Sequence, residues 1–107
     1  MNRVTLTGRR LGKAIPFGEG LRGIKFLLRA PYKYPHEGQG KEASTVVPCL
    51  IFQCSEELRA LLLGDDKELW IEAEGRINRS SYEASDGVRK YSTEVILNPL
   101  TAFVSQR

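Results

Sequence analysis

A chain of 107 residues has the size of one small domain, and we treat residues 1–107 as a single unit. Hydrophobic residues make up 41% and charged residues 27% of the chain, a composition that excludes global disorder. No apolar run approaches the roughly 20 residues of a membrane-spanning helix. The chain also enters a strand-like pattern at once, without a signal segment, so we expect a cytoplasmic protein with no membrane partner.

The net charge of +3 is distributed unevenly along the chain. Residues 1–33 hold eight basic side chains and one acid, a net of +7, whereas residues 34–75 hold three basic side chains and nine acids, a net of −6. Residues 76–107 have a net of +2. If the first and last segments share a face, that face will attract a polyanion. The alternative is a scatter of solvated surface charges.

The residues that could support catalysis or metal binding are few. Cys49, Cys54 and the single histidine, His36, cannot complete a four-ligand zinc site within one chain, so we expect two reduced thiols and no metal. The pair Gly18-x-Gly20 is not followed by a helix pattern, and no catalytic triad or phosphate-binding glycine loop is present. The sequence therefore predicts no enzyme, no cofactor and no small-molecule substrate.

Alternating apolar and polar residues predict two N-terminal strands joined by a turn over residues 16–20. The first strand covers Val4 to Thr7, and Gly8 and Gly12 flank a bend that follows it. The second strand covers Ile24 to Arg29. Its core face consists of Ile24, Phe26 and Leu28, and its other face of Lys25, Leu27 and Arg29.

The middle of the chain changes character twice. Residues 31–43 contain two prolines and two glycines and predict a long loop, a type of segment that is often functional in a compact domain. This loop contains Tyr32, Lys33 and Tyr34. Residues 44–53 form an apolar run rich in β-branched side chains and predict a strand, in which Pro48 indicates an edge position or a bulge.

A short helix and two further strands are predicted in the second half. Ser55 has the properties of an N-cap, Gly64 ends the helix, and its core face consists of Leu58, Leu61 and Leu62. The fourth strand covers residues 69–78, and the fifth covers residues 91–97 after a hairpin turn at Ser85-Asp86-Gly87. The core face of the fourth strand consists of Leu69, Ile71, Ala73, Gly75 and Ile77.

This order of elements predicts an all-β fold, namely a five-stranded OB-fold Greek-key barrel with one short helix between strands 3 and 4. The OB-fold binds oligonucleotides on the face formed by its second and third strands. Lys25 and Arg29 lie on the non-core face of the second strand and are therefore the leading candidates for phosphate contacts.

Four stretches of the chain resemble the bacterial and organellar single-stranded DNA-binding protein (SSB) family in order and spacing. They are Asn2-Arg3-Val4-x-Leu6-x-Gly8, Ile51-Phe52, Glu74-Gly75-Arg76-Ile77 and Asp86-Gly87-x-x-x-Tyr91-Ser92-Thr93-Glu94-Val95. The resemblance extends from Asn2 to about Val104. It implies sequence-tolerant binding of single-stranded DNA in replication, recombination or repair, by a homotetramer, with a dimer as the alternative.

The resemblance also implies the chemistry of the site: unpaired bases stack on aromatic rings, and lysines and arginines contact the phosphates. Phe52 and Tyr82 match stacking positions of the family, and Tyr34 and Tyr32 lie in a loop where the family places another ring. Val46 stands where the family usually has tryptophan. The candidate phosphate contacts are Arg3, Arg9, Arg10, Lys25, Arg29, Lys33, Arg76, Arg79 and Lys90.

Several alternatives remain open at this point. Phe52 ends an apolar run, so its ring belongs either to the core or to the binding face. Trp70 alternates outward with acidic neighbours and is interpreted as a subunit contact. The acidic middle third also allows an OB-fold adaptor whose main partner is a protein, similar to primosomal replication protein N. The family usually continues into an acidic tail, and this sequence stops at Arg107. We expect association with the bacterial nucleoid, with an organellar, plasmid or phage source left open.

Overall fold

The computed structural model describes residues 1–33, 42–65 and 69–106. Within these ranges the chain forms six strands, one α-helix and one short 3-10 helix, and no helix has the length and apolar character needed to cross a membrane. The helices are η1 (Glu19–Leu21) and α1 (Glu56–Leu63). The strands are β1 (Val4–Phe17), β2 (Gly23–Lys33), β3 (Glu42–Phe52), β4 (Leu69–Glu83), β5 (Arg89–Leu97) and β6 (Phe103–Gln106).

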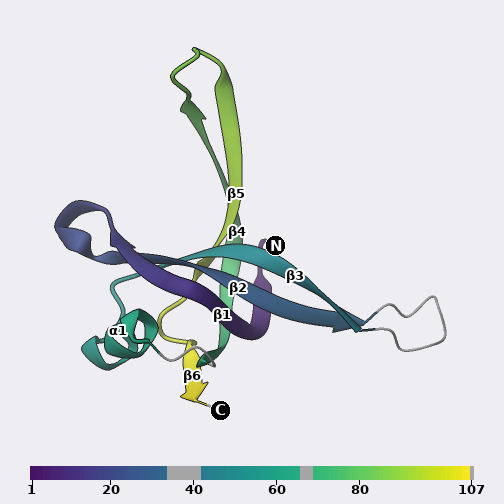
Figure 1. The fold of residues 1–107 in the computed structure, drawn as a ribbon, viewed down its shortest axis with the longest axis vertical. Helices are drawn as coiled ribbons and strands as arrows, with labels where there is room; N and C mark the ends of the chain where they lie inside the picture. The colour runs from purple at the N-terminus through teal and green to yellow at the C-terminus, as the bar shows by residue number, and fades with distance from the viewer. Residues whose placement is uncertain (34–41, 66–68, 107) are drawn as a thin grey trace.

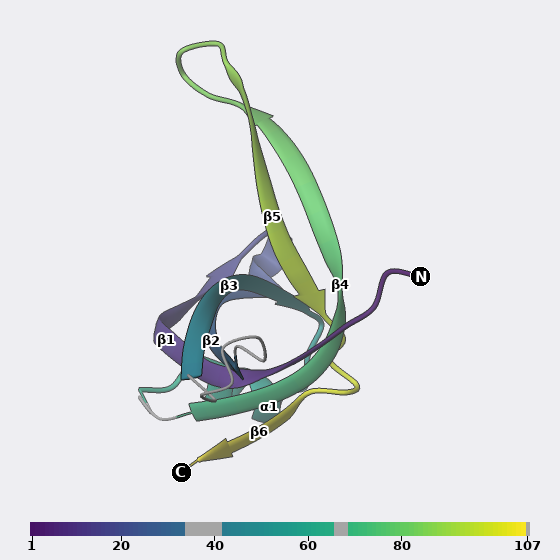
Figure 2. The same ribbon diagram turned by 90° about the vertical axis from the view of Figure 1, so that its right-hand side faces the viewer.

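The first five strands close into a barrel. Their order is β1-β2-β3-β5-β4, and β4 pairs again with β1, so that the sheet returns to its first strand. The closed ring is visible end-on in Figure 2, and Figure 1 shows the two strands β4 and β5 extending out of it. This connectivity, with the helix between β3 and β4, confirms the predicted OB-fold.

Strand β1 is longer than predicted because it does not end at a bend. Its first part, from Val4 to Arg9, pairs with β4, and its second part, from Arg9 to Phe17, pairs with β2. The register with β2 shifts between Leu11 and Ile15. Gly12, with a φ of 64°, lies in this irregularity, so the glycine bends a continuous strand where the sequence suggested an interruption.

The predicted loop of residues 31–43 is shorter than expected. Strand β2 continues through Lys33 and β3 begins at Glu42, with the two residues paired across the ladder. The predicted ends of the loop were therefore wrong. The fixed φ of Pro31 is compatible with extended backbone, so β2 continues through this residue. Tyr34 lies outside the described residues. Pro48 lies directly before the three residues of β3 that also pair with β5, so it occupies the predicted edge position.

The barrel core consists of side chains that the alternation predicts. Ile24 and Leu28 of β2 are fully buried, and they pack with the inward residues of β3, β4 and β5. Cys49 belongs to this core; burial raises the pKa of its thiol to about 12, and both it and Cys54 are free thiols. Because side chains alternate across a strand, the residues between these point to the outer surface of the barrel.

Helix α1 covers one end of the barrel and has the predicted caps. The Ser55 side chain accepts a hydrogen bond of 3.2 Å from the backbone N–H of Leu58, and Gly64 ends the helix. Leu58 and Leu62 are buried, as predicted. The prediction was wrong for Leu61, which is 37% exposed, because Leu63 packs against the core instead.

Two features of the second half were not predicted. Strands β4 and β5, joined at the predicted turn of residues 85–87, continue beyond the barrel as a two-stranded hairpin, paired as far as Glu83 and Arg89 (Figure 1). Ile77, expected in the core, is 52% exposed because it lies beyond Gly75, the last residue of β4 that pairs with β1. The C-terminal β6 pairs with β4. It lies beside Trp70, which is half-buried and has Arg9 of β1 and Ser105 of β6 as its pairing partners.

Candidate nucleic-acid interface

A groove of about 560 Å³ lies where the N-terminal segment meets the strands β4 and β5. Phe52, Arg3 and Arg76 line it, together with the carboxylate of Glu74 and the polar side chains of Asn2 and Asn98. The groove therefore brings together one aromatic and two basic residues of the predicted set, from three separate parts of the chain. An aromatic ring beside cations is the combination that binds unpaired nucleotides without sequence preference.

The N-terminal segment is fixed to β4 by side-chain hydrogen bonds. The amide of Asn2 donates to the Ile77 carbonyl at 2.8 Å and accepts from the Ile77 backbone N–H at 2.9 Å, beyond the last backbone pair of β1 and β4. Next to it, Arg3 Nη2 lies 2.7 Å from Glu74 Oε1. Asn2 thus positions Arg3 at the groove. In the sequence, Asn2 stood out only as part of a motif, and its positioning role was not predicted.

Phe52 is held on the outer surface at the end of β3. Its pairing partner in β2 is Gly23, which leaves room for the ring, and a Cβ at Gly23 would approach the rings of Phe17 and Phe52. The Phe17 and Phe52 rings lie 5.4 Å apart in an edge-to-face arrangement. Phe52 is 39% exposed, so its ring is available at the surface and does not belong to the core.

A row of outward residues crosses the barrel beside Phe52. Lys25 is opposite Leu50, Leu50 is opposite Ile96, and Ile96 is opposite Arg76. The row therefore has a cation at each end and apolar side chains between them. Lys25 and Arg76 are both exposed. Together they could hold the phosphates of a strand whose bases rest on the apolar part of the row.

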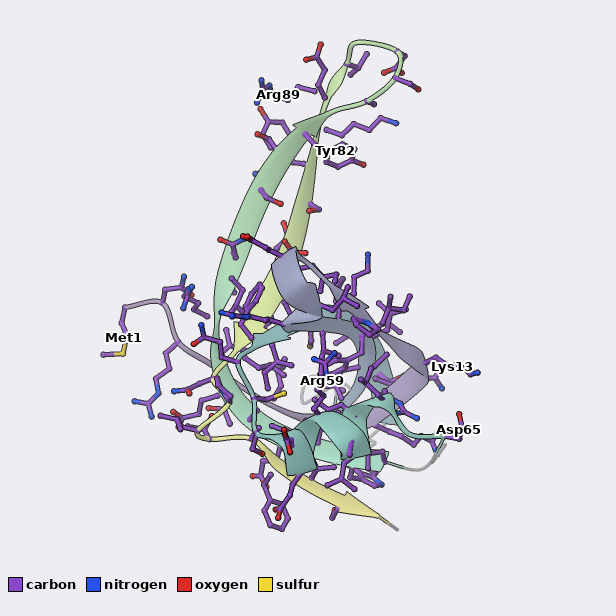
Figure 3. The ribbon with its side chains drawn as sticks, turned by 90° about the vertical axis from the view of Figure 1, so that its left-hand side faces the viewer. Met1, Lys13, Arg59, Asp65, Tyr82 and Arg89 are labelled. Atoms are coloured by element: carbon purple, nitrogen blue, oxygen red, sulfur yellow. The ribbon has the colours of Figure 1, made fainter. Side chains whose placement is uncertain are left out.

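The same face continues onto the hairpin. Beyond Arg76, the pairs on this face are Asn78–Glu94, Ser80–Ser92 and Tyr82–Lys90. Tyr82 is 53% exposed, and its neighbour across the ladder, Lys90, is exposed as well. The register thus places Phe52, Arg76, Tyr82 and Lys90 along one continuous face, which we call the groove face. Figure 3 shows Tyr82 near the end of the hairpin, pointing away from it.

Two predicted phosphate contacts lie apart from the groove face. Arg9 and Arg29 are pairing partners, and Arg29 in turn is opposite Val46. Along β2, Arg29 and Lys25 are four residues apart, a separation of roughly 13 Å in a strand. The apolar row of Leu11, Leu27 and Pro48 lies between them. Val46, the position without the family's tryptophan, is 46% exposed.

Arg10 does not fit the predicted role of phosphate contact. It is 3% exposed, and its Nη1 donates a hydrogen bond to the carbonyl of Leu62 near the end of α1. A cation in the last turn of a helix is favourable for the helix dipole. The burial could have been anticipated, because Leu6, Gly8 and Arg10 follow the period of two that turns side chains inward. Arg10 is therefore a structural residue.

Of the four remaining predicted site residues, the structure describes the side chain of one, Arg79. Arg79 lies on the face of the hairpin opposite to Tyr82, because it is three positions away along the strand. Tyr32 and Lys33 belong to β2, but their side chains are not among those the structure describes. Tyr34 lies outside the described residues. Tyr91, which is 58% exposed, was not predicted as a site residue, although its position directly after two basic residues was a signal.

Comparisons with known proteins identify relatives of this chain by sequence and by fold. No family model matches the chain. It is 34% identical over 100 residues to a single-stranded DNA-binding protein of Clostridium tetani, an alignment that covers 90% of this chain and 66% of that protein. It is 31% identical over 100 residues to single-stranded DNA-binding protein 2 of Clostridium acetobutylicum, with coverage of 90% and 71%. The chain thus spans about two thirds of the length of these relatives.

A solved structure shares the fold. The Plasmodium falciparum SSB in complex with ssDNA superimposes with a TM-score of 0.70 at 16% identity and covers 98% of this chain and 93% of that one. This likeness supports the OB-fold, while the sequence relatives identify the family, as the motifs around Asn2, Phe52, Gly75 and Tyr91 indicated. The chain therefore belongs to the family of single-stranded DNA-binding proteins.

Proposed function

We propose that residues 1–107 are a single domain that binds single-stranded DNA along the groove face, without catalysis, in the replication, recombination or repair of DNA. The observation that carries this proposal is the continuity of the face. Phe52 and Tyr82 supply stacking surfaces at its two ends, and Arg3, Lys25, Arg76 and Lys90 supply positive charge along it. Stacking and phosphate contacts together tolerate any base sequence.

The family supports the choice of ligand. The curated relatives are named for binding single-stranded DNA, and the Plasmodium structure is a complex with ssDNA. We place the protein in the cytoplasm, at the nucleoid, where such DNA is exposed. Arg9 and Arg29 extend the proposed contacts beyond the groove face, and the side chains of Tyr32, Lys33, Tyr34 and Arg79 remain proposed contacts on the evidence of their sequence positions.

We expect steep salt dependence in a direct binding experiment, because much of the attraction is to phosphates. Fluorescence anisotropy of a labelled oligo-dT should give a plot of log K against log salt with a slope of about −2, if Lys25, Arg76 and Lys90 each neutralise one phosphate while Arg3 stays paired with Glu74. Arg76→Gln should make this slope shallower by about 0.7.

A matched control is Arg59→Gln, since Arg59 lies in α1 and lines neither the groove nor the hollow beside Lys25. This variant should leave the slope unchanged. If the unmodified protein fails to bind oligo-dT even at low salt, the proposed function is wrong, and the alternative of an adaptor with a protein as its main partner gains support.

We further propose that the protein is a homotetramer. An apolar patch on the outside of β1, β2 and β3 supports this: Leu11, Leu27 and Pro48 border a hollow of about 390 Å³, and Leu27 is 44% exposed. Exposed apolar patches commonly mark protein interfaces. Half-buried Trp70 is proposed as an additional subunit contact.

Light scattering should give a mass about four times the 12.0 kDa of one chain. Leu27→Glu should lower this mass, because a carboxylate in an apolar interface would lose its hydration. Val88→Glu places the same charge at the exposed end of the hairpin and should leave the mass unchanged. A monomeric mass for the unmodified protein would contradict the proposal.

A further inference from the structure

The hairpin beyond the barrel has a second face that the groove face does not include. Tyr82 is paired with Lys90, and the next pair along the ladder is Ser81 with Tyr91. Because neighbouring residues of a strand point to opposite sides, Tyr82 and Tyr91 lie on opposite faces of the same hairpin. Figure 3 shows this division directly, since Tyr82 and Arg89 point to opposite sides of the two strands.

The second face carries an exposed tyrosine ring and two arginines. The guanidinium carbon of Arg79 lies 4.5 Å from the centre of the Tyr91 ring, and Tyr91 is 58% exposed. Arg89 Nη1 donates a hydrogen bond of 2.9 Å to the Ser81 hydroxyl. The carboxylate on this face is that of Glu83, the pairing partner of Arg89, so the face is basic overall.

The contact between Arg79 and Tyr91 forms a flat, charged surface. A guanidinium group over a tyrosine ring is a cation–π pair, and the planar guanidinium can itself stack on an aromatic plane. A hollow of about 410 Å³ is lined by Arg79, Tyr91, Ser80 and Ser81. This surface offers a π-face or guanidinium plane for a base, positive charge for a phosphate and the Ser81 hydroxyl for a hydrogen bond.

An unpaired nucleotide fits this surface better than a protein partner does. Two arginines beside an exposed ring attract a ligand that has both a negative charge and a planar ring system. Each nucleotide of a single strand has both, in its phosphate and its unpaired base. A base within a duplex would not expose its π-face for stacking. A second copy of this chain would place the same positive charges close to each other unless an acidic region faced them.

We propose that the face formed by Arg79, Tyr91 and Arg89 is a second stacking site for single-stranded nucleic acid, on the opposite side of the hairpin from Tyr82. The inference rests on the proposed function, since it assigns a second contact region to the same ligand. One consequence is that the hairpin is held between two stretches of DNA. A strand that leaves Tyr82 turns around the end of the hairpin and returns along Tyr91, or two strands bind to the two faces.

Photocrosslinking tests this inference on the whole protein. An oligo-dT that contains 5-iodo-deoxyuridine should crosslink to Tyr91 as well as to Tyr82, with the sites identified by mass spectrometry. Crosslinks at Tyr82 without any at Tyr91 would overturn the second site and leave the proposed function intact. If the oligonucleotide neither binds nor crosslinks anywhere, the proposed function itself fails.

Variants of the second face give an independent measure. With an oligo-dT of about 16 nucleotides, the upper end of the site size of one OB-fold, Tyr91→Ala should reduce affinity about 5- to 150-fold, the range for one stacked base. With about 4 nucleotides, which the groove face can bind alone, affinity should change less than twofold. Tyr91→Phe keeps the ring and should retain binding of both oligonucleotides.

Two further results separate a binding role from a structural one. Arg79→Lys keeps the charge but loses the guanidinium plane, so it should also weaken binding of the longer oligonucleotide. An equal loss for both lengths would show that Tyr91 only maintains the hairpin. A lower oligomeric mass with unchanged affinity would assign the face to a second copy of the chain. Either outcome would overturn the second stacking site.

Discussion

Replacement of Phe52 and Tyr82 together by alanine is expected to weaken the binding of oligo-dT by about 2–6 kcal/mol, because each ring that stacks on a base contributes about 1–3 kcal/mol. The barrel should remain folded. Phe52 is 39% and Tyr82 53% exposed, so neither side chain fills the core. The contact between the Phe52 and Phe17 rings is the main packing interaction lost, at a cost in stability of about 0.5–1.5 kcal/mol.

The measurement is fluorescence anisotropy at one low salt concentration, combined with thermal unfolding of the same samples. Val88→Ala is a suitable control, since Val88 is an exposed apolar residue at the end of the hairpin and should affect neither property. Tyr82→Trp should strengthen binding, because a larger ring stacks over more of the base. Unchanged affinity of the double variant would place the binding site elsewhere on the surface.

The second large effect is expected from Gly8→Ala, which should destabilise the fold by about 3 kcal/mol or more. Gly8 lies in β1, opposite Ile71 of β4, at the point where β1 also comes close to Arg29 of β2. A Cβ at this position would lie 2.8 Å from the carbonyl carbon of Arg29 and still closer to its oxygen. Overpacking typically costs about 1–3 kcal/mol, and here the obstructing atoms are backbone atoms that no rotamer change can move.

Urea unfolding followed by circular dichroism measures this loss. Gly12→Ala provides the matched control in the same strand. Gly12 has a φ of 64°, which strains any other residue, but no atom lies within 4 Å of its added Cβ, so only the conformational cost of about 1–2 kcal/mol should appear. Equal destabilisation by the two substitutions would show that crowding at the closure of the barrel is not important.

Local patterns in the sequence determined most of the fold. The alternation around Ile24 and Leu28 identified β2 and its buried face, and Ser55 and Gly64 identified both ends of α1. These features depend on neighbours a few residues away, through the pleat of a strand or the hydrogen bonds of a helix end. The four motifs around Asn2, Phe52, Gly75 and Tyr91 were also legible in the sequence, and their order and spacing together indicated the family.

Contacts between distant residues determined the groove. Asn2 bonds to Ile77, 75 residues away, and this pairing brings Arg3 to the same hollow as Arg76. No periodicity in the sequence encodes which strands become neighbours. The short β6 was missed for this reason, since it is defined by its pairing with the start of β4.

The charge pattern shows both what the sequence determined and what the tertiary structure decided. The sequence alone determined that the first 33 residues are strongly basic, and a face built from them attracts a polyanion. Only the tertiary structure decided which cations can reach it: Arg10 turns inward to α1, whereas Arg3 and Arg76 reach the groove. It also divided the hairpin's tyrosines between two faces. The physical reason is that exposure depends on where the barrel ends and which strands pair, and these are properties of the closed sheet as a whole.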